Sequence, residues 1–193
     1  MSVASVETSV PGTSSRHRWR RRLLLGSLGI VLLAVAVFAA TTLWLTVFPA
    51  TNEPAHADGI LSFNGGQEAA RSALAVSLAE KGYARVLLFS QGGEGTDTSC
   101  PKVPRVLVVC FVDVSNNTRG EAEWAGRYAA RHDWHSLLIV PGRTQATRAR
   151  VLMERCFSGS VTVVPPSGPR PALSDVVHQW AGLLDAVFVH RSC

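Results

Sequence analysis

Short apolar runs alternate with amphipathic stretches along this chain from about residue 57 onward. The apolar runs do not alternate with polar positions, which is typical of strands covered on both faces of a parallel sheet. The most hydrophobic run, residues 106–112, is predicted to form the central strand. The predicted strands are residues 59–63, 85–90, 106–112, 137–140 and 161–164.

Between these runs, apolar residues are spaced as on one face of a helix. Apolar residues repeat at helical spacing from Ala70 to Leu78, and Gly82 is placed to end that helix. Further helices are predicted at residues 118–129, 143–155 and 173–189. Strands that alternate with helices predict a doubly wound α/β domain over residues 57–193, with a mostly parallel sheet of about five strands.

The N-terminal part of the chain has a different pattern. Residues 23–48 contain no charged side chain, and as a helix they would extend about 39 Å, more than the ~30 Å of a bilayer core. Arginines precede this run, which places the N-terminus in the cytoplasm. The sequence predicts a disordered basic tail (residues 1–22), a single-pass signal anchor in the cytoplasmic membrane (residues 23–48) and a linker (residues 49–56).

A cleaved signal peptide is the alternative, because residues 55–57 form an Ala-x-Ala pattern. That pattern lies far beyond the end of the apolar run, and the run is much longer than a signal peptide requires. An uncleaved anchor is therefore favoured. Both interpretations place the C-terminal domain outside the cytoplasm.

The formal net charge of +5 is concentrated in the tail. Residues 1–22 hold five arginines and one glutamate, so the remaining chain is nearly neutral. A nucleic-acid partner is not expected, because the folded part offers no basic surface in its composition.

Four cysteines follow the apolar run, and an even number in an oxidising compartment predicts two disulfides. Of three possible pairings, we favour Cys100–Cys110 and Cys156–Cys193, which tie a loop to its strand and the C-terminus to a helix. Alternatively, Cys110 is a buried free thiol. The chain has no Cys-x-x-Cys pair, so no metal site is expected, and the sequence specifies no cofactor.

Candidate chemistry gathers where the predicted strands end, because ligands of doubly wound sheets bind beyond the carboxyl ends of the strands. Glycine N–H groups and arginines there suit an anionic ligand such as a phosphate ester. Glu121 is the candidate catalytic residue, as a general base. The predicted ligand-binding residues are Asn64, Gly65, Gly66, Arg71, Ser90, Gly92, Gly93, Asn117, Thr118 and Arg148.

Each candidate also has a structural interpretation. Thr118 and Glu121 are spaced as a helix capping box. Arg71 and Arg148 have the alternative of being solvated helix residues. The glycine-rich loop at residues 91–95 lacks the Gly-Lys-Ser/Thr ending of a phosphate-binding loop, and such a loop is usually a flexible connection.

Taken together, these motifs resemble the YdcF-like family over roughly residues 57–165. The most specific likenesses are the step from Thr118 to Glu121 and the Arg148-Ala149 pair after a strand. The resemblance implies a Rossmann-like domain behind an N-terminal membrane anchor, associated with cell-envelope biogenesis.

The chain departs from the family pattern at three places. Pro141-Gly142 stands where the family has Thr-Ser, and Ser90 is followed by Gln91 before the glycines. Gln145 stands where the family has a histidine three residues before the arginine, and an amide cannot transfer protons as a histidine does.

The sequence therefore predicts an envelope-biogenesis protein whose extracytoplasmic domain binds an anionic small molecule or a lipid-linked envelope precursor without catalysis. The alternative is a hydrolase or transferase that acts on a phosphorylated cell-wall precursor.

Overall fold

The computed structural model describes residues 14–65, 68–92, 100–113, 115, 117–168, 173–189 and 193. The chain divides into two compact units, Met1–Thr41 and Thr42–Cys193. The first unit contains helix α1 (Ser14–Thr42), which ends at the border of the second.

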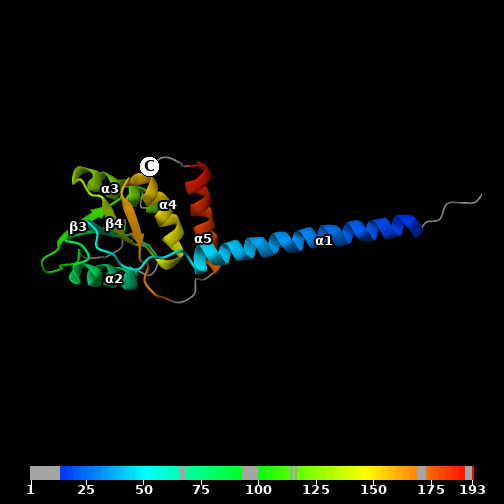
Figure 1. Cartoon of the computed structure of the whole chain (residues 1–193), viewed down its shortest axis with the longest axis horizontal. Helices are drawn as coiled ribbons and strands as arrows, with labels where there is room; N and C mark the ends of the chain where they lie inside the picture. Colours follow the sequence, from blue (N-terminus) through cyan, green and yellow to red (C-terminus); the bar gives the residue numbers. More distant parts are fainter. Residues whose placement is uncertain are drawn as a thin grey trace, which may run out of the picture. The chain divides into compact units, whose positions relative to one another are not determined.

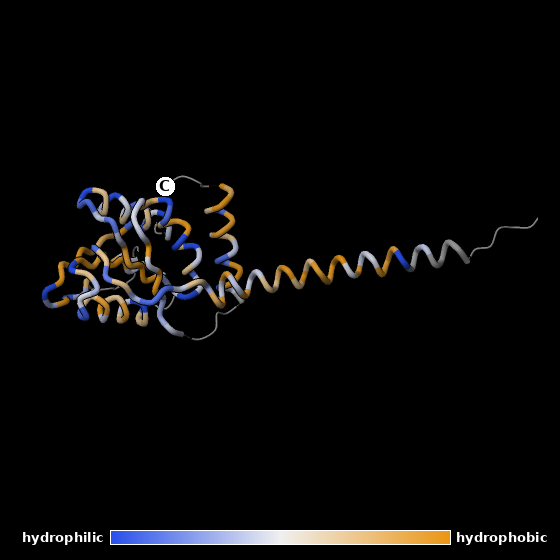
Figure 2. The backbone as a smooth tube through the Cα atoms, in the orientation of Figure 1, coloured by the Kyte–Doolittle hydropathy of each residue, from blue (hydrophilic) through white to orange (hydrophobic). Residues whose placement is uncertain are grey.

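Helix α1 continues into the short π-helix η1 (Leu43–Val47). Within the described residues, one helical segment, Arg22–Val47, is long and apolar enough to cross a membrane. Figure 2 shows its mostly hydrophobic colouring, and residues 23–47 contain no charged side chain. The helix begins at Ser14, so residues 14–22 are helical and were wrongly predicted to be disordered. Arginine is a good helix former, and nothing in this stretch breaks a helix.

The second unit is built on a five-stranded sheet in which every pair of neighbours is parallel, as predicted. Its strand order is β3-β2-β1-β4-β5 (Figure 1). The strands are β1 (Gly59–Ser62), β2 (Val86–Gln91), β3 (Leu107–Val112), β4 (Ser136–Val140) and β5 (Ser160–Val163).

The prediction that residues 106–112 form the central strand is wrong. β3 lies at an edge of the sheet, and its terminal residues Leu107 and Val112 are 59% and 55% exposed. The centre is β1, in which all four residues are buried. The position of a strand in a sheet depends on backbone pairing, which the hydrophobicity of its side chains does not encode.

The helices follow the predicted positions closely. Gly82 ends α2 with an N–H bond to the carbonyl of Ala79 (2.9 Å), as expected. The helix predicted from residue 143 starts as a 3₁₀ turn. The elements are α2 (Glu68–Glu80), α3 (Thr118–Arg131), η2 (Arg143–Gln145), α4 (Ala146–Cys156), α5 (Leu173–Leu184) and the π-helix η3 (Asp185–Val189).

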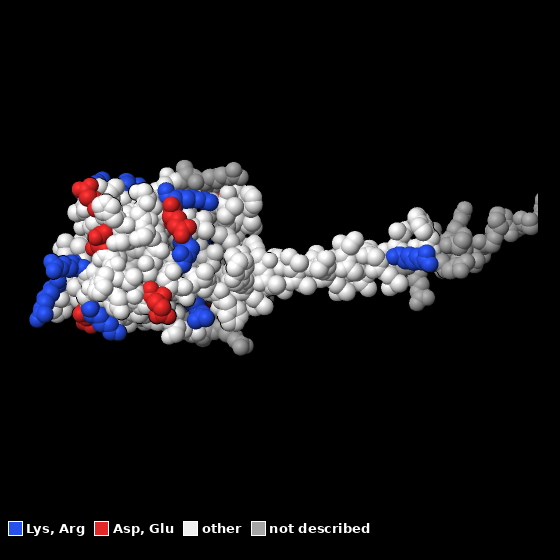
Figure 3. Space-filling view, in the orientation of Figure 1, with Lys and Arg blue, Asp and Glu red and all other residues white. Residues whose placement is uncertain are grey.

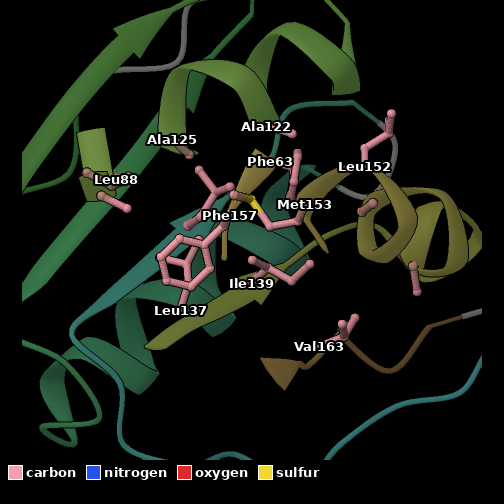
Figure 4. Close-up of a cluster of buried hydrophobic side chains, with 14 of the residues drawn as sticks. Phe63, Leu88, Ala122, Ala125, Leu137, Ile139, Leu152, Met153, Phe157 and Val163 are labelled. Atoms are coloured by element: carbon pink, nitrogen blue, oxygen red, sulfur yellow. The ribbon is translucent and has the colours of Figure 1, made fainter. Parts of the chain in front are cut away.

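Two hydrophobic clusters lie on the two faces of the sheet. On one face, Ile60, Leu87 and Leu138 pack with Ala75 and Leu78 of α2. The other face packs against α3 and α4, and Figure 4 shows this cluster around Phe63, Leu88, Ile139, Met153 and Phe157. Each fully buried Leu or Phe contributes about 1.5–3 kcal/mol to folding, so these two clusters hold the layers together.

Both predicted disulfides are confirmed, Cys100–Cys110 and Cys156–Cys193. The alternative that Cys110 is a free thiol is therefore wrong. The second bridge joins the last residue of the chain to the end of α4, across 37 positions of sequence.

The linker and η1 are fastened to α4 and β5. Asn52 exchanges hydrogen bonds with Val163 of β5: its N–H donates to the carbonyl (2.9 Å), and its Oδ1 accepts from the N–H (3.0 Å). Thr147 Oγ1 of α4 donates to the carbonyl of Leu45 (2.7 Å). The last turn of the apolar segment is thus attached to the side of the domain formed by α4.

Candidate functional site

A cavity of about 800 Å³ lies where the strands end at their carboxyl side. β1 pairs with β2 on one side and with β4 on the other, so the chain reverses its direction of strand addition beside the cavity. Ligands of open parallel sheets bind at such reversal points, and the volume is typical of small-molecule sites. The lining residues used below are Asn64, Gly65, Ser90, Asp113, Asn117, Thr118, Glu121, Gln145, Arg148, His178, Gly182 and Asp185.

Glu121 lines this cavity and is only 3% exposed. Its carboxylate accepts the backbone N–H of Asn64 (2.6 Å) and a hydrogen bond from the Ser90 hydroxyl. Burial raises the pKa of Glu121 to about 7, although these two hydrogen bonds and the positive charge of Arg71 act in the opposite direction. The cavity therefore contains a carboxyl group that exchanges its proton near neutral pH, as a general acid or base does.

The capping-box interpretation of Thr118 and Glu121 is wrong. The N-cap of α3 is Asn117, whose Oδ1 accepts the backbone N–H groups of Arg119 (3.0 Å) and Gly120 (2.9 Å). Asn117 is better placed because its short side chain folds back onto the first turn. The carboxylate of Glu121 instead contacts Asn64 after β1 and Ser90 in β2.

Arg148 of α4 lines the cavity opposite the first turn of α3. Its Nη2 donates to Oγ1 of Thr118 (3.0 Å), and its Nε has no hydrogen-bond partner among the described residues. Burial lowers the pKa of Arg148 and the charge of Glu121 raises it, but a guanidinium remains protonated in proteins. A cation with one buried, unpaired donor therefore forms part of the cavity wall.

Helix α5 approaches this arginine at Gly182, where a Cβ atom would overlap Nη1 of Arg148. A side chain at this position would push the guanidinium away from the helix backbone. The structure thus uses α5 as a second wall of the cavity, with His178 and Asp185 on the same side of the helix as Gly182.

Arg71 is placed differently from the expectation that it contacts ligand. It is 1% exposed and does not line the cavity. Its Nη1 donates to the carbonyl of Gly65 (2.8 Å). Burial lowers the pKa of Arg71, while Glu121 and Glu68 raise it. Arg71 therefore supports the turn after β1 and supplies positive charge near Glu121.

Gly65 and Gln145 join the turns that follow β1 and β4. Gly65 has φ +108°, which favours glycine, and a Cβ atom there would overlap Nε2 of Gln145. Oε1 of Gln145 accepts the N–H of Gly142 (3.2 Å). Gln145 therefore lines the cavity and contributes an amide to it.

The predicted site residues fall into three groups. Asn64, Gly65, Ser90, Asn117, Thr118, Glu121 and Arg148 meet around the cavity. Arg71 and Gly92 are buried and do not line it. Gly66 and Gly93 lie outside the described residues.

The α5 wall was missed by sequence reasoning, because its residues lie inside a helix and not directly after the end of a strand. A signal was present: His178, Gly182 and Asp185 recur at spacings of four and three on an otherwise apolar helix.

Charges of both signs surround the cavity. Arg119 is paired with Glu123 (Nε to Oε1, 2.9 Å), while Asp113, Glu121 and Asp185 contribute carboxyl groups. Figure 3 likewise shows basic and acidic side chains interspersed over the visible face of the domain. In the described part of the chain, no group of three or more His, Cys, Asp or Glu side chains is placed to hold a metal ion.

Comparison of the chain with models of known families and with curated proteins finds no match.

Proposed function

We propose that this chain is a membrane-anchored envelope-biogenesis protein whose extracytoplasmic domain binds an anionic ligand, phosphorylated or lipid-linked, in the cavity. The observation that carries the proposal is Arg148. Its guanidinium borders the cavity, is oriented by Thr118 (3.0 Å), and retains a donor without a partner. Arginine presents several donors to a phosphate or carboxylate at once, which suits it for this role.

The fold supports this proposal. The strand order β3-β2-β1-β4-β5 corresponds to the order of the Rossmann-like, doubly wound arrangement, and core clusters lie on both faces of the sheet. The resemblance of the sequence to the YdcF-like family agrees with that topology and supports a role in the cell envelope.

The location is supported by two further features. The segment Arg22–Val47 is long and apolar enough to cross a membrane, and arginines precede it. Two disulfides in the domain suit an oxidising compartment. Both features favour a cytoplasmic N-terminus and a domain on the outer side.

A second candidate function is hydrolysis or transfer at a phosphorylated cell-wall precursor, and Glu121 favours it. A carboxyl group with a pKa of about 7 that lines a cavity is suited to proton transfer. Binding without catalysis remains the primary proposal, because Gln145 occupies the position of the family's histidine. If the wild type hydrolyses a phosphate ester and Glu121→Gln does not, the protein is an enzyme. Hydrolysis gained only in Gln145→His would indicate an enzyme that has lost its activity.

The binding proposal is tested by thermal unfolding of the full chain in detergent, in the presence of inorganic phosphate, nucleotides, nucleotide sugars and polyprenyl phosphates. A ligand present at 100 times its Kd should stabilise the fold by about 2.7 kcal/mol. The shift should disappear in Arg148→Ala. It should persist in Arg131→Ala, which removes an exposed arginine from the last turn of α3. The absence of any shift in the wild type, or an equal shift in Arg148→Ala, would contradict the proposal.

A further inference from the structure

The C-terminal helix formed by α5 and η3 is apolar around most of its circumference, but the domain covers only part of it. Gln179 and Ala186 face the domain and are 6% and 2% exposed. Val177, Leu184 and Phe188 are 63%, 47% and 65% exposed. A helix that is apolar all round is normally buried on every side, so the described part of the chain leaves this outer face without a cover.

The outer face, defined here as Val177, Leu184 and Phe188, runs along one side of the helix. Its members are separated by seven and four positions, which places them on that side. Figure 2 shows the corresponding hydrophobic colouring of α5. Between residues 176 and 189, the ionisable side chains are His178 and Asp185, and both line the cavity instead. The outer face is therefore free of charge.

On its side away from the cavity, α5 is joined to the end of the apolar segment. Nε1 of Trp180 donates to Oγ1 of Thr42 (3.0 Å), the last residue of α1. A small pocket between the two elements is lined by Leu45 and Thr46 from η1 and by Trp180 and Leu183 from α5. The segment Arg22–Val47 thus ends directly beside α5.

The residues at that end are themselves exposed and apolar. Leu43, Trp44 and Phe48 are 50%, 69% and 62% exposed. They flank Thr42, Leu45 and Thr46, which contact Trp180 and Leu183 of α5, so uncovered apolar side chains lie on two neighbouring elements. The bilayer that the apolar segment would cross lies next to these elements and is able to cover both.

We propose that the outer face of α5 lies in the headgroup region of the leaflet from which the apolar segment emerges, as a second contact of the domain with lipid. Amphipathic helices bury such a face to a depth of about 5–10 Å, and tryptophans such as Trp44 and Trp180 favour that zone. This inference rests on the membrane anchor in the proposed function. It would place the cavity wall formed by His178, Gly182 and Asp185 about one helix diameter, ~10 Å, from the lipid surface.

The test is depth-dependent fluorescence quenching of the full chain in phosphatidylcholine/phosphatidylglycerol vesicles that contain spin-labelled lipids. An environment-sensitive dye is attached to an added cysteine in Phe188→Cys or, independently, in Leu184→Cys. The native cysteines are occupied in disulfides. Ala130→Cys, exposed on α3, is the matched control, and Val35→Cys reports whether the anchor is inserted.

A spin label near the headgroup should reduce the emission at residues 188 and 184 about twofold, because both dyes then lie within the ~5–10 Å interfacial zone. The dye at residue 130 should be unaffected. Quenching at residue 35 without quenching at 188 and 184 would overturn the lipid contact and leave the anchor intact. Crosslinking between copies through residue 188, without quenching, would assign the face to self-association instead. Absence of quenching at all three positions would overturn the anchor as well.

Discussion

The two walls of the cavity are held in place in different ways. The wall formed by the strand ends and α3 is tied internally: Glu121 accepts the N–H of Asn64, and Asn117 caps the helix. The α5 wall is attached by a disulfide to α4, by Arg155 donating to the carbonyl of Ala186, and by Trp180 bonded to Thr42. Polar groups of the first wall therefore contribute to both fold and site, whereas the second wall is an added element fastened at a few points.

The largest expected effect comes from releasing the α5 wall. Replacing Cys156 and Cys193 together by alanine opens a bridge across 37 positions and should lower the free energy of unfolding by about 4 kcal/mol. Replacing Cys100 and Cys110, which are 10 positions apart, should cost about 3 kcal/mol. Denaturant titration of the full chain measures both. Equal losses would indicate that α5 is held mainly by other contacts.

On the first wall, Arg71→Met should lower the free energy of unfolding by about 3 kcal/mol, because it removes a buried positive charge near Glu121 and the donor to Gly65. Arg71→Met/Glu121→Gln should recover part of that loss, since the attraction between the two charges is then absent from both sides of the comparison. Strict additivity of the two substitutions would show that the charges are not coupled.

The raised pKa of Glu121 predicts a pH dependence of stability. The folded protein holds this proton up to a pH of about 7, whereas the unfolded chain releases it near 4.5. The stabilisation is fully present below pH 4.5 and is lost as the pH rises through 7, amounting to about 2.5 kcal/mol between pH 5 and pH 8. Glu121→Gln should remove this dependence, whereas Glu123→Gln, on the same helix, should retain it. A wild type whose stability is flat over this range would refute the raised pKa.

The comparison of the walls also explains what the sequence could predict. Apolar runs and helical spacing located the strands and helices, because both periods are local. The ends of parallel strands meet at one edge, so Asn64, Ser90 and Thr118 could be brought together in advance. Both disulfide pairings could likewise be predicted, from the loop, strand and helix that each cysteine adjoins.

The remainder depends on tertiary placement. The edge position of β3 follows from backbone pairing, and the burial of Arg71 beneath the turn after β1 follows from packing of α2 on the sheet. Asn117, and not Thr118, caps α3, and sequence spacing alone does not distinguish two adjacent residues. The α5 wall comes from a helix beyond the last strand, which no rule about strand ends locates.

The central claim, that Arg148 binds an anion in the cavity, is tested most directly by calorimetry. The affinity of the ligand that most stabilises the wild type is compared between the wild type, Arg148→Ala and Arg131→Ala. A charge-assisted hydrogen bond is worth about 1.5–3 kcal/mol, so Arg148→Ala should weaken binding by roughly 10- to 100-fold. Arg131→Ala should bind as the wild type does. Equal affinities in the wild type and Arg148→Ala would contradict the account.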